Sequence, residues 1–201
     1  MNKLVVKVAI LTFLSLIAVS LISAFSIFTF APGFAGDKCF ELGLKNVATK
    51  CYERAYEQTG EFDDLVILVD NAIFSEDGDA VIEYGTKMIN RNDEFSAFCI
   101  ETDEKSEYVD YSSYDYYVTA VMMANYNAGK KTEAVDIAFS KLTADGYKEG
   151  IALFYAVQLA KEDEDLLQII LSSYKASTNR TFTNYKAFRE ELQGIDPEIK
   201  F

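Results

Sequence analysis

The side chains of this sequence that could do acid–base or metal chemistry are carboxylates and cysteines, because the chain contains no histidine. A Ser-His-Asp or Cys-His arrangement is therefore excluded, and neither a P-loop nor a GxGxxG segment occurs. The carboxylates gather in short runs: Asp77, Asp79, Glu101, Asp103, Glu104 and Glu162–Asp165. Paired carboxylates can exchange protons with a substrate, but no sequence feature marks one of these pairs as buried.

We interpret these runs as solvated surface and helix caps. The sequence then predicts no enzymatic activity, no catalytic residue, no metal site and no cofactor. The alternative is a weak divalent-cation site at Asp77 and Asp79 or within Glu162–Asp165. The stretch "EDGD" has an acidic character, but it lacks the ligand spacing and the glutamate of an EF-hand.

The three cysteines, Cys39, Cys51 and Cys99, have no metal-ligand spacing. We interpret them as small buried hydrophobic residues. A disulfide between Cys39 and Cys51 is the alternative if the body of the protein is exported, although the geometry of such a bond is demanding.

The charge of the chain excludes two classes of function. There are 19 basic and 32 acidic residues, which gives a formal net charge of −13. Binding to nucleic acid requires Lys and Arg that neutralise phosphates, and docking on anionic lipid requires a basic surface. The sequence therefore predicts no nucleic-acid partner.

The N-terminal segment predicts a membrane anchor in residues 1–35. No charged residue occurs between Lys7 and Asp37, and this apolar run is long enough to cross a bilayer. It is also longer than the apolar region of a signal peptide. We expect Pro32 to end or kink the helix. The alternative is cleavage near Gly33 and Ala35, which would yield a secreted protein.

Basic residues at the start favour one orientation of the anchor. Lys3, Lys7 and the terminal amine predict a cytoplasmic N-terminus, with the body on the extracytoplasmic side of the cell membrane. Four basic residues that follow the span weaken this inference: Lys38, Lys45, Lys50 and Arg54.

Beyond the anchor, the apolar residues follow a helical period almost throughout, which predicts an all-α body. Proline occurs only at positions 32 and 197, so no proline interrupts the body. Breaks are expected at Ser75–Asp79, with Asp79 capping the next helix, at Gly129, and at Thr143–Gly150. A last amphipathic helix carries Phe182, Tyr185, Phe188 and Leu192 and ends before Gly194.

A spacing pattern recurs in the predicted helices. The first copy places small, aromatic and small residues at i, i+4 and i+7, and the others match it at the same spacing: Ala48/Tyr52/Ala55, Ala80/Tyr84/Lys87, Ala134/Ala138/Lys141 and, more weakly, Leu167/Leu171/Tyr174. The copies start 32, 54 and 33 residues apart. The excess in the second step falls on an acidic segment at about residues 92–113, which lacks a helical stripe over much of its length.

The segments "GLKNVATKCYERAYEQTG" and "AGKKTEAVDIAFSKL" resemble the second half of the tetratricopeptide repeat (TPR). In both, a turn glycine lies five residues before the first small residue, as in Gly43 and Ala48. The resemblance implies a TPR-like α-solenoid of about three to four helical hairpins in residues 36–180, with residues 181–201 as a C-terminal capping helix and tail. A helical-hairpin solenoid of another repeat family is the alternative.

In a TPR-like solenoid the first helix of each hairpin lines the concave face. The resemblance therefore implies seven exposed partner-binding residues: Ile67, Asn71, Phe74, Tyr116, Thr119, Met123 and Tyr126. These side chains include no lysine or arginine, and they suit an apolar or basic peptide. Clustered tyrosines offer either a second recognition surface or the start of a packed helix: Tyr108, Tyr111, Tyr114, Tyr116 and Tyr117.

The sequence thus predicts a membrane-anchored scaffold that binds a partner protein or peptide through a helical-repeat surface. Two alternatives remain, namely an accessory subunit of a membrane protein complex and a secreted ligand- or cation-binding protein. The sequence predicts no particular oligomeric state and names no partner.

Overall fold

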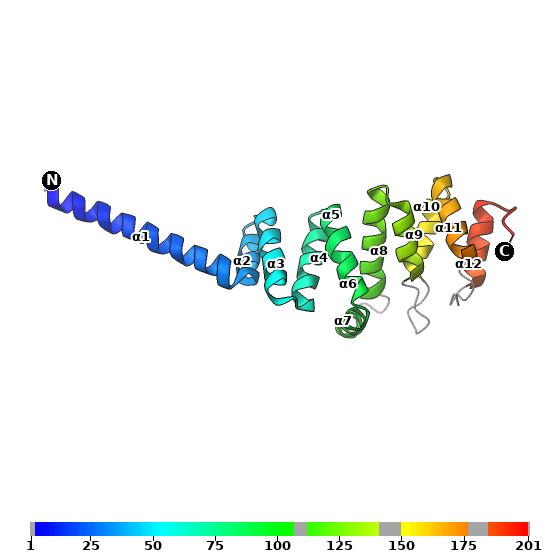
Figure 1. Cartoon of the computed structure of the whole chain (residues 1–201), viewed down its shortest axis with the longest axis horizontal. Helices are drawn as coiled ribbons and strands as arrows, with labels where there is room; N and C mark the ends of the chain where they lie inside the picture. Colours follow the sequence, from blue (N-terminus) through cyan, green and yellow to red (C-terminus); the bar gives the residue numbers. More distant parts are fainter. Residues whose placement is uncertain (1–2, 107–111, 141–149, 177–184, 201) are drawn as a thin grey trace. The chain divides into compact units, whose positions relative to one another are not determined.

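The structure, a computed structural model, describes residues 3–106, 112–140, 150–176 and 185–200, and every regular element within these ranges is a helix (Figure 1). The elements are α1 Lys3–Phe30, α2 Pro32–Glu41, α3 Lys45–Thr59, α4 Phe62–Phe74, α5 Gly78–Ala80, the π-helical turn η1 Val81–Gly85, α6 Thr86–Asn90, α7 Asn92–Lys105, α8 Ser113–Asn127, α9 Lys131–Ser140, α10 Ile151–Leu159, α11 Glu164–Ala176 and α12 Tyr185–Ile195. The chain divides into two compact units, residues 1–71 and 72–201. The predicted all-α class is confirmed.

Helix α1 is long and apolar enough to cross a membrane over Ile10–Phe30, and no part of this segment is buried within the protein. The helix ends at Phe30, and Pro32 occupies the first turn of α2. Proline has no N–H to continue a helical ladder but is well accommodated in a first turn. The predicted break at Pro32 is confirmed. Gln58 of α3 donates a hydrogen bond of 3.0 Å to the carbonyl of Thr29, so α3 also contacts the end of α1.

Helices α2 and α3 form a hairpin in the first unit through small residues. A Cβ added to Gly36 would lie 2.5 Å from the ring of Tyr52, so only glycine permits this approach. The Tyr52 hydroxyl donates to Asp37 at 3.0 Å, which satisfies its polar end. Tyr52 is buried together with Ala48 and Ala55. The small face of this helix therefore serves close packing.

Three interhelical turns share one backbone motif. Gly43, Glu76 and Gly129 each have a left-handed φ, of 74°, 57° and 76°. In each turn the next residue's N–H bonds to the carbonyl five positions earlier, as in Lys130 to Asn125 at 2.9 Å. This is the Schellman ending of a helix. The motifs are 33 and 53 residues apart, so the turns repeat with nearly the spacing that the sequence pattern predicted.

The turn motif corrects the register of the second repeat. Five residues after Gly43 and Gly129 come Ala48 and Ala134, both fully buried; five after Glu76 comes Val81, also buried. The predicted stripe Ala80/Tyr84/Lys87 was wrong by one residue, because Lys87 is exposed and its neighbours Met88 and Ile89 are buried.

The register shift has a cause in the turn itself. Asp77, rather than the predicted Asp79, caps the new helix, since its carboxylate accepts from the N–H of Ala80 at 3.1 Å. Position 85 then faces the core as a glycine, and a Cβ there would lie 2.5 Å from Cγ2 of Val121 on α8. Gly85 closes the π-helical turn η1 and permits this contact.

The first part of the acidic segment at about residues 92–113 is helical. Its first fourteen residues form α7, which packs against α8. Phe95 and Cys99 are its buried face, and the Phe95 ring lies 5.0 Å from Tyr114 and 6.2 Å from Tyr117. A buried face of only two positions leaves no visible period, which is why the sequence shows no helical stripe over much of this segment. Tyr114 and Tyr117 pack in the core, which confirms the packing interpretation for these two.

In the second unit, each helix from α8 to α10 contacts the next two: α8 packs on α9 and α10, α9 on α10 and α11, and α10 on α11 and α12. Helix α12 follows, with Leu192 fully buried and the Phe188 ring 6.3 Å from Phe139 and 5.6 Å from Tyr174. It extends through Gly194, beyond its predicted end. Four positions that the sequence interpretation used lie outside the described residues: Tyr108, Tyr111, Lys141 and Phe182. The break at Thr143–Gly150 lies outside them as well, except for Gly150.

The left-handed turns predict opposite responses to exchange of glycine. Gly129→Ala should destabilise the protein by about 1 kcal/mol, since a Cβ disfavours this φ although the space around it is open. Glu76→Gly should stabilise it by roughly 0.5 kcal/mol, because strain is relieved at some cost in chain entropy. Chemical unfolding followed by circular dichroism measures both changes.

Gly194→Ala is the matched control in the same unit. It lies in α12 with ordinary φ and open space, so alanine should stabilise by about 0.5–1 kcal/mol. Equal effects at positions 129 and 194 would contradict the assignment of a left-handed turn at Gly129.

Candidate functional site

The seven predicted binding residues fall on α4 and α8. Ile67 and Asn71 belong to the first unit; Phe74, Tyr116, Thr119, Met123 and Tyr126 belong to the second. Ile67, Phe74 and Tyr116 are exposed, and Thr119 and Met123 are half-buried. The Tyr116 ring packs edge-on against that of Tyr117 at 5.1 Å.

Asn71 does not present its amide to a partner. Its side chain is only 5% exposed, and Nδ2 donates to Oγ1 of Thr49 on α3 at 2.7 Å. A buried amide that is bonded to a neighbouring helix stabilises the packing of that helix. The prediction of an exposed Asn71 was wrong, because the helical period alone did not reveal that Thr49 faces this position.

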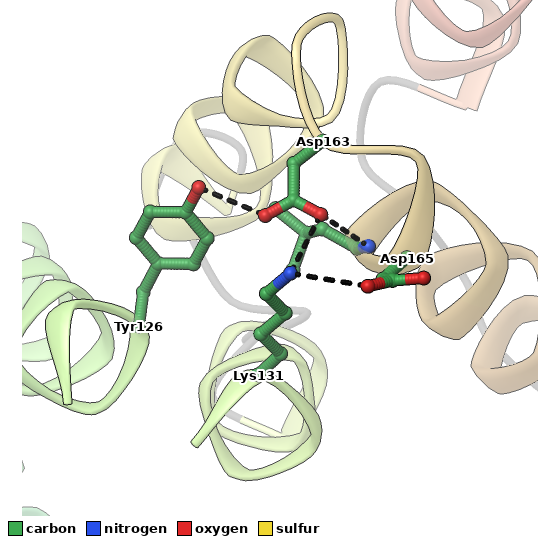
Figure 2. A network of polar contacts seen from close by, with 5 residues as sticks. Tyr126, Lys131, Asp163 and Asp165 are labelled. Atoms are coloured by element: carbon green, nitrogen blue, oxygen red, sulfur yellow. Dashed lines mark hydrogen bonds and ion pairs between the residues drawn. The ribbon is translucent and has the colours of Figure 1, made fainter. Parts of the chain in front are cut away.

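Tyr126 is committed to a polar network that joins three segments of the second unit (Figure 2). Its hydroxyl donates to Asp163 at 3.0 Å, and Lys131 of α9 forms an ion pair with the same carboxylate at 2.8 Å. Asp163 also accepts from the N–H of Leu166 at 3.0 Å and so caps α11. Asp165 lies 3.5 Å from Lys131 at the edge of this network. We call these groups the Asp163 network.

The ionisation of this network follows from its hydrogen bonds. The bond from Lys131, followed by that from the Leu166 N–H, lowers the pKa of Asp163 below its usual value. The same bond to Asp163 raises the pKa of Lys131, and donation to a carboxylate raises the pKa of Tyr126. Each shift favours the protonation state found at neutral pH. Such groups stabilise the fold and are poor proton donors or acceptors.

Asp163, the least exposed carboxylate of the run at residues 162–165, therefore has a structural role. In the described part of the chain, no three Asp, Glu or Cys side chains converge as metal ligands would. Burial, followed by the charges of Asp103 and Asp115, raises the pKa of the Cys99 thiol to about 12, so it is not a nucleophile at neutral pH.

Helix α10 carries an exposed apolar stripe that the sequence interpretation missed. Ile151, Phe154 and Tyr155 are 36%, 53% and 47% exposed, and they lie at i, i+3 and i+4 on one side of the helix. The opposite side is buried through Ala152, Leu153, Ala156 and Val157. A signal was available, because all nine residues of α10 are uncharged and a short helix cannot bury its whole circumference.

The stripe on α10 corresponds to the predicted positions on α8. Helix α10 ends 32 residues after α8, so Ile151 lies as far before the end of α10 as Thr119 lies before the end of α8, and Tyr155 matches Met123 in the same way. We define the α8–α10 face as the exposed or half-buried residues Tyr116, Thr119, Met123, Ile151, Phe154 and Tyr155. It contains no charged side chain.

Comparison with models of protein families found no match to this chain, and comparison with curated proteins found no relative.

The Asp163 network predicts a pH-dependent contribution to stability. Asp163→Asn should destabilise the protein by about 1 kcal/mol at pH 7, since it removes a charge-assisted hydrogen bond from a side chain that is 14% exposed. The folded-state pKa of Asp163 is lowered, so this stabilisation is present at neutral pH. It is lost as the pH falls from 3.8 through the lower folded-state pKa. Urea unfolding at several pH values measures the difference.

Asp165→Asn is the matched control, because this carboxylate also faces Lys131 but is 87% exposed. Its effect should be near zero at every pH. If Asp163→Asn lowered the free energy of unfolding by the same amount at every pH, including pH values below the folded-state pKa of Asp163, an ion-pair origin would be contradicted.

Proposed function

We propose that this chain is a membrane-anchored helical-repeat module that binds a partner protein or peptide through the α8–α10 face. The observation that carries the proposal is the exposed stripe of Ile151, Phe154 and Tyr155 on α10. Three adjacent large apolar side chains of this exposure are typical of interaction sites. Aromatic residues are also enriched at the anchor positions of interfaces.

A TPR-like α-solenoid is the architecture we infer for the repeats. In such a solenoid each hairpin stacks on the next, and first helices contact first helices. The packing of α8 on α10 and of α9 on α11 fits this arrangement. The turn spacing of 33 residues between Gly43 and Glu76 fits the repeat length as well. Helix α7 then accounts for most of the extra residues that separate the second repeat from the third.

The chemistry of the face favours an apolar or basic peptide. Its side chains are aromatic, aliphatic and hydroxyl, and the chain around them carries a formal net charge of −13. A partner with apolar anchors flanked by Lys or Arg would gain from both features. An acidic peptide would be repelled at long range.

The location we infer is the cell membrane, with α1 as a single uncleaved anchor. Its support is the length and composition of Ile10–Phe30. Lys3 and Lys7 precede this segment, which favours a cytoplasmic N-terminus and an extracytoplasmic body.

Binding should be lost when the α8–α10 face is charged. Tyr155→Lys should weaken partner binding at least about tenfold, since truncating or charging an aromatic anchor costs more than about 1.4 kcal/mol. The full chain in detergent, with a photoreactive residue at position 155, captures the partner, and titration of that partner measures the affinity.

Ile100→Lys is the matched control, because Ile100 is an apolar residue of α7 that is 51% exposed. Ile100→Lys should leave the affinity unchanged, and a photoreactive residue placed at position 100 should not cross-link to the partner. Equal affinity of the two variants for the partner would show that the α8–α10 face is not the binding site. Binding that survives Tyr155→Lys but requires the native sequence of α1 would identify an accessory subunit.

The proposed orientation predicts a protease-accessible C-terminus. In intact cells, external protease should remove a tag placed after Phe201 and spare a tag placed before Met1. The intact mass of the purified protein should retain residues 1–35. The opposite pattern of protection would reverse the orientation, and a mass that lacks the apolar segment would support the secreted alternative.

A further inference from the structure

Two of the three cysteines lie in one helix–helix interface. Cys39 of α2 and Cys51 of α3 are both free and buried. These helices form the hairpin that directly follows the apolar helix α1. Cys99 belongs to α7 in the other unit, where burial and the charges of Asp103 and Asp115 raise the pKa of its thiol.

The register of the hairpin brings Cys39 and Cys51 together. A Cβ on Gly33 would lie 3.9 Å from Ala55, and one on Gly36 would contact the ring of Tyr52. The two helices therefore run antiparallel, and an advance of three residues along α2 corresponds to three residues back along α3. The next step from Gly36 is Cys39, which falls opposite the turn that carries Ala48 and Cys51.

The small residues also set the distance between the helices. Glycine at position 36 lets α2 approach the ring of Tyr52 closely, and buried Ala48 adds little bulk beside the cysteines. A disulfide requires Cα atoms within about 7 Å, which only closely packed helices provide. The neighbouring Cys39 is also one of the causes that raise the pKa of Cys51, which agrees with this register.

We propose that Cys39 and Cys51 are a disulfide-forming pair that links α2 covalently to α3. One thiolate attacks an external disulfide, such as oxidised glutathione, to give a mixed disulfide and one free thiol. The second thiolate attacks the protein sulfur of this intermediate and releases the second thiol. Two cysteine thiols are oxidised to one disulfide, and the external disulfide is reduced to two thiols.

The environment of the pair determines how this bond forms. Burial, followed by the neighbouring Cys39, raises the pKa of Cys51. The attacking thiolate is therefore scarce in the closed hairpin, and oxidation accelerates at higher pH or when the hairpin opens. Once formed, the bond closes a short loop around Gly43 and restricts the unfolded chain. It stabilises the hairpin that adjoins the anchor, independently of the α8–α10 face.

Oxidation of the purified full chain in detergent tests this assignment. The protein is incubated at pH 8 with oxidised and reduced glutathione, quenched with acid, alkylated after denaturation and mapped by mass spectrometry. We expect one Cys39–Cys51 linked peptide, with Cys99 alkylated, and faster formation as the pH rises. The thermal midpoint of the first unit should rise by about 10 °C relative to the reduced protein.

Persistent glutathione adducts on Cys39 or Cys51 would overturn the proposal, as would two free thiols at the most oxidising ratio. Cys51→Ala should abolish the linked peptide and the response of the thermal midpoint to reductant. Cys99→Ala, which removes another buried thiol, should leave both unchanged. If Cys51→Ala does not fold, the map of the unsubstituted protein still decides the question.

Discussion

Close approach of paired helices is the constraint on which the rest of this structure depends. A single short helix with one apolar side cannot bury that side alone, so each helix needs a neighbour. Gly36 against Tyr52 and Gly85 against Val121 are two points where a Cβ would not fit. Close packing around these points excludes water from alanine-rich faces, and it is the physical reason for the small residues in the repeated pattern.

The turns and the Asp163 network orient the helices that this packing brings together. Schellman turns at Gly43, Glu76 and Gly129 end three of the helices at a fixed register, which determines the side that the next helix buries. Asp163 acts where no such residue occurs, in the turn between α10 and α11. Its carboxylate caps α11 and binds Tyr126 and Lys131, so one side chain joins α8, α9 and α11. The lowered pKa of Asp163 and the raised pKa values of Lys131 and Tyr126 follow from these structural contacts.

Much of the fold could be predicted from the sequence, because helical period, proline and glycine are local signals. The break at Pro32, the buried Ala48 and Ala134, and the turn at Gly129 are of this kind. The left-handed turn at Glu76 has no glycine to indicate it, so the predicted register of the second repeat was wrong by one residue. Asn71 was misplaced for a related reason. Its partner Thr49 lies 22 residues away, and no periodicity within one helix reveals such a pair.

The surface proposed for binding was predicted in part on α8 and missed on α10. Helix α11 places Glu164, Asp165 and Lys175 toward its ends, as expected for a solvated helix. Helix α10 has no charged residue, yet only one side of it is buried. In a chain with a net charge of −13, apolar side chains on the other side reduce solubility without stabilising the core. Their presence is accounted for if a partner covers them, which makes α10 the strongest functional signal in the body of this protein.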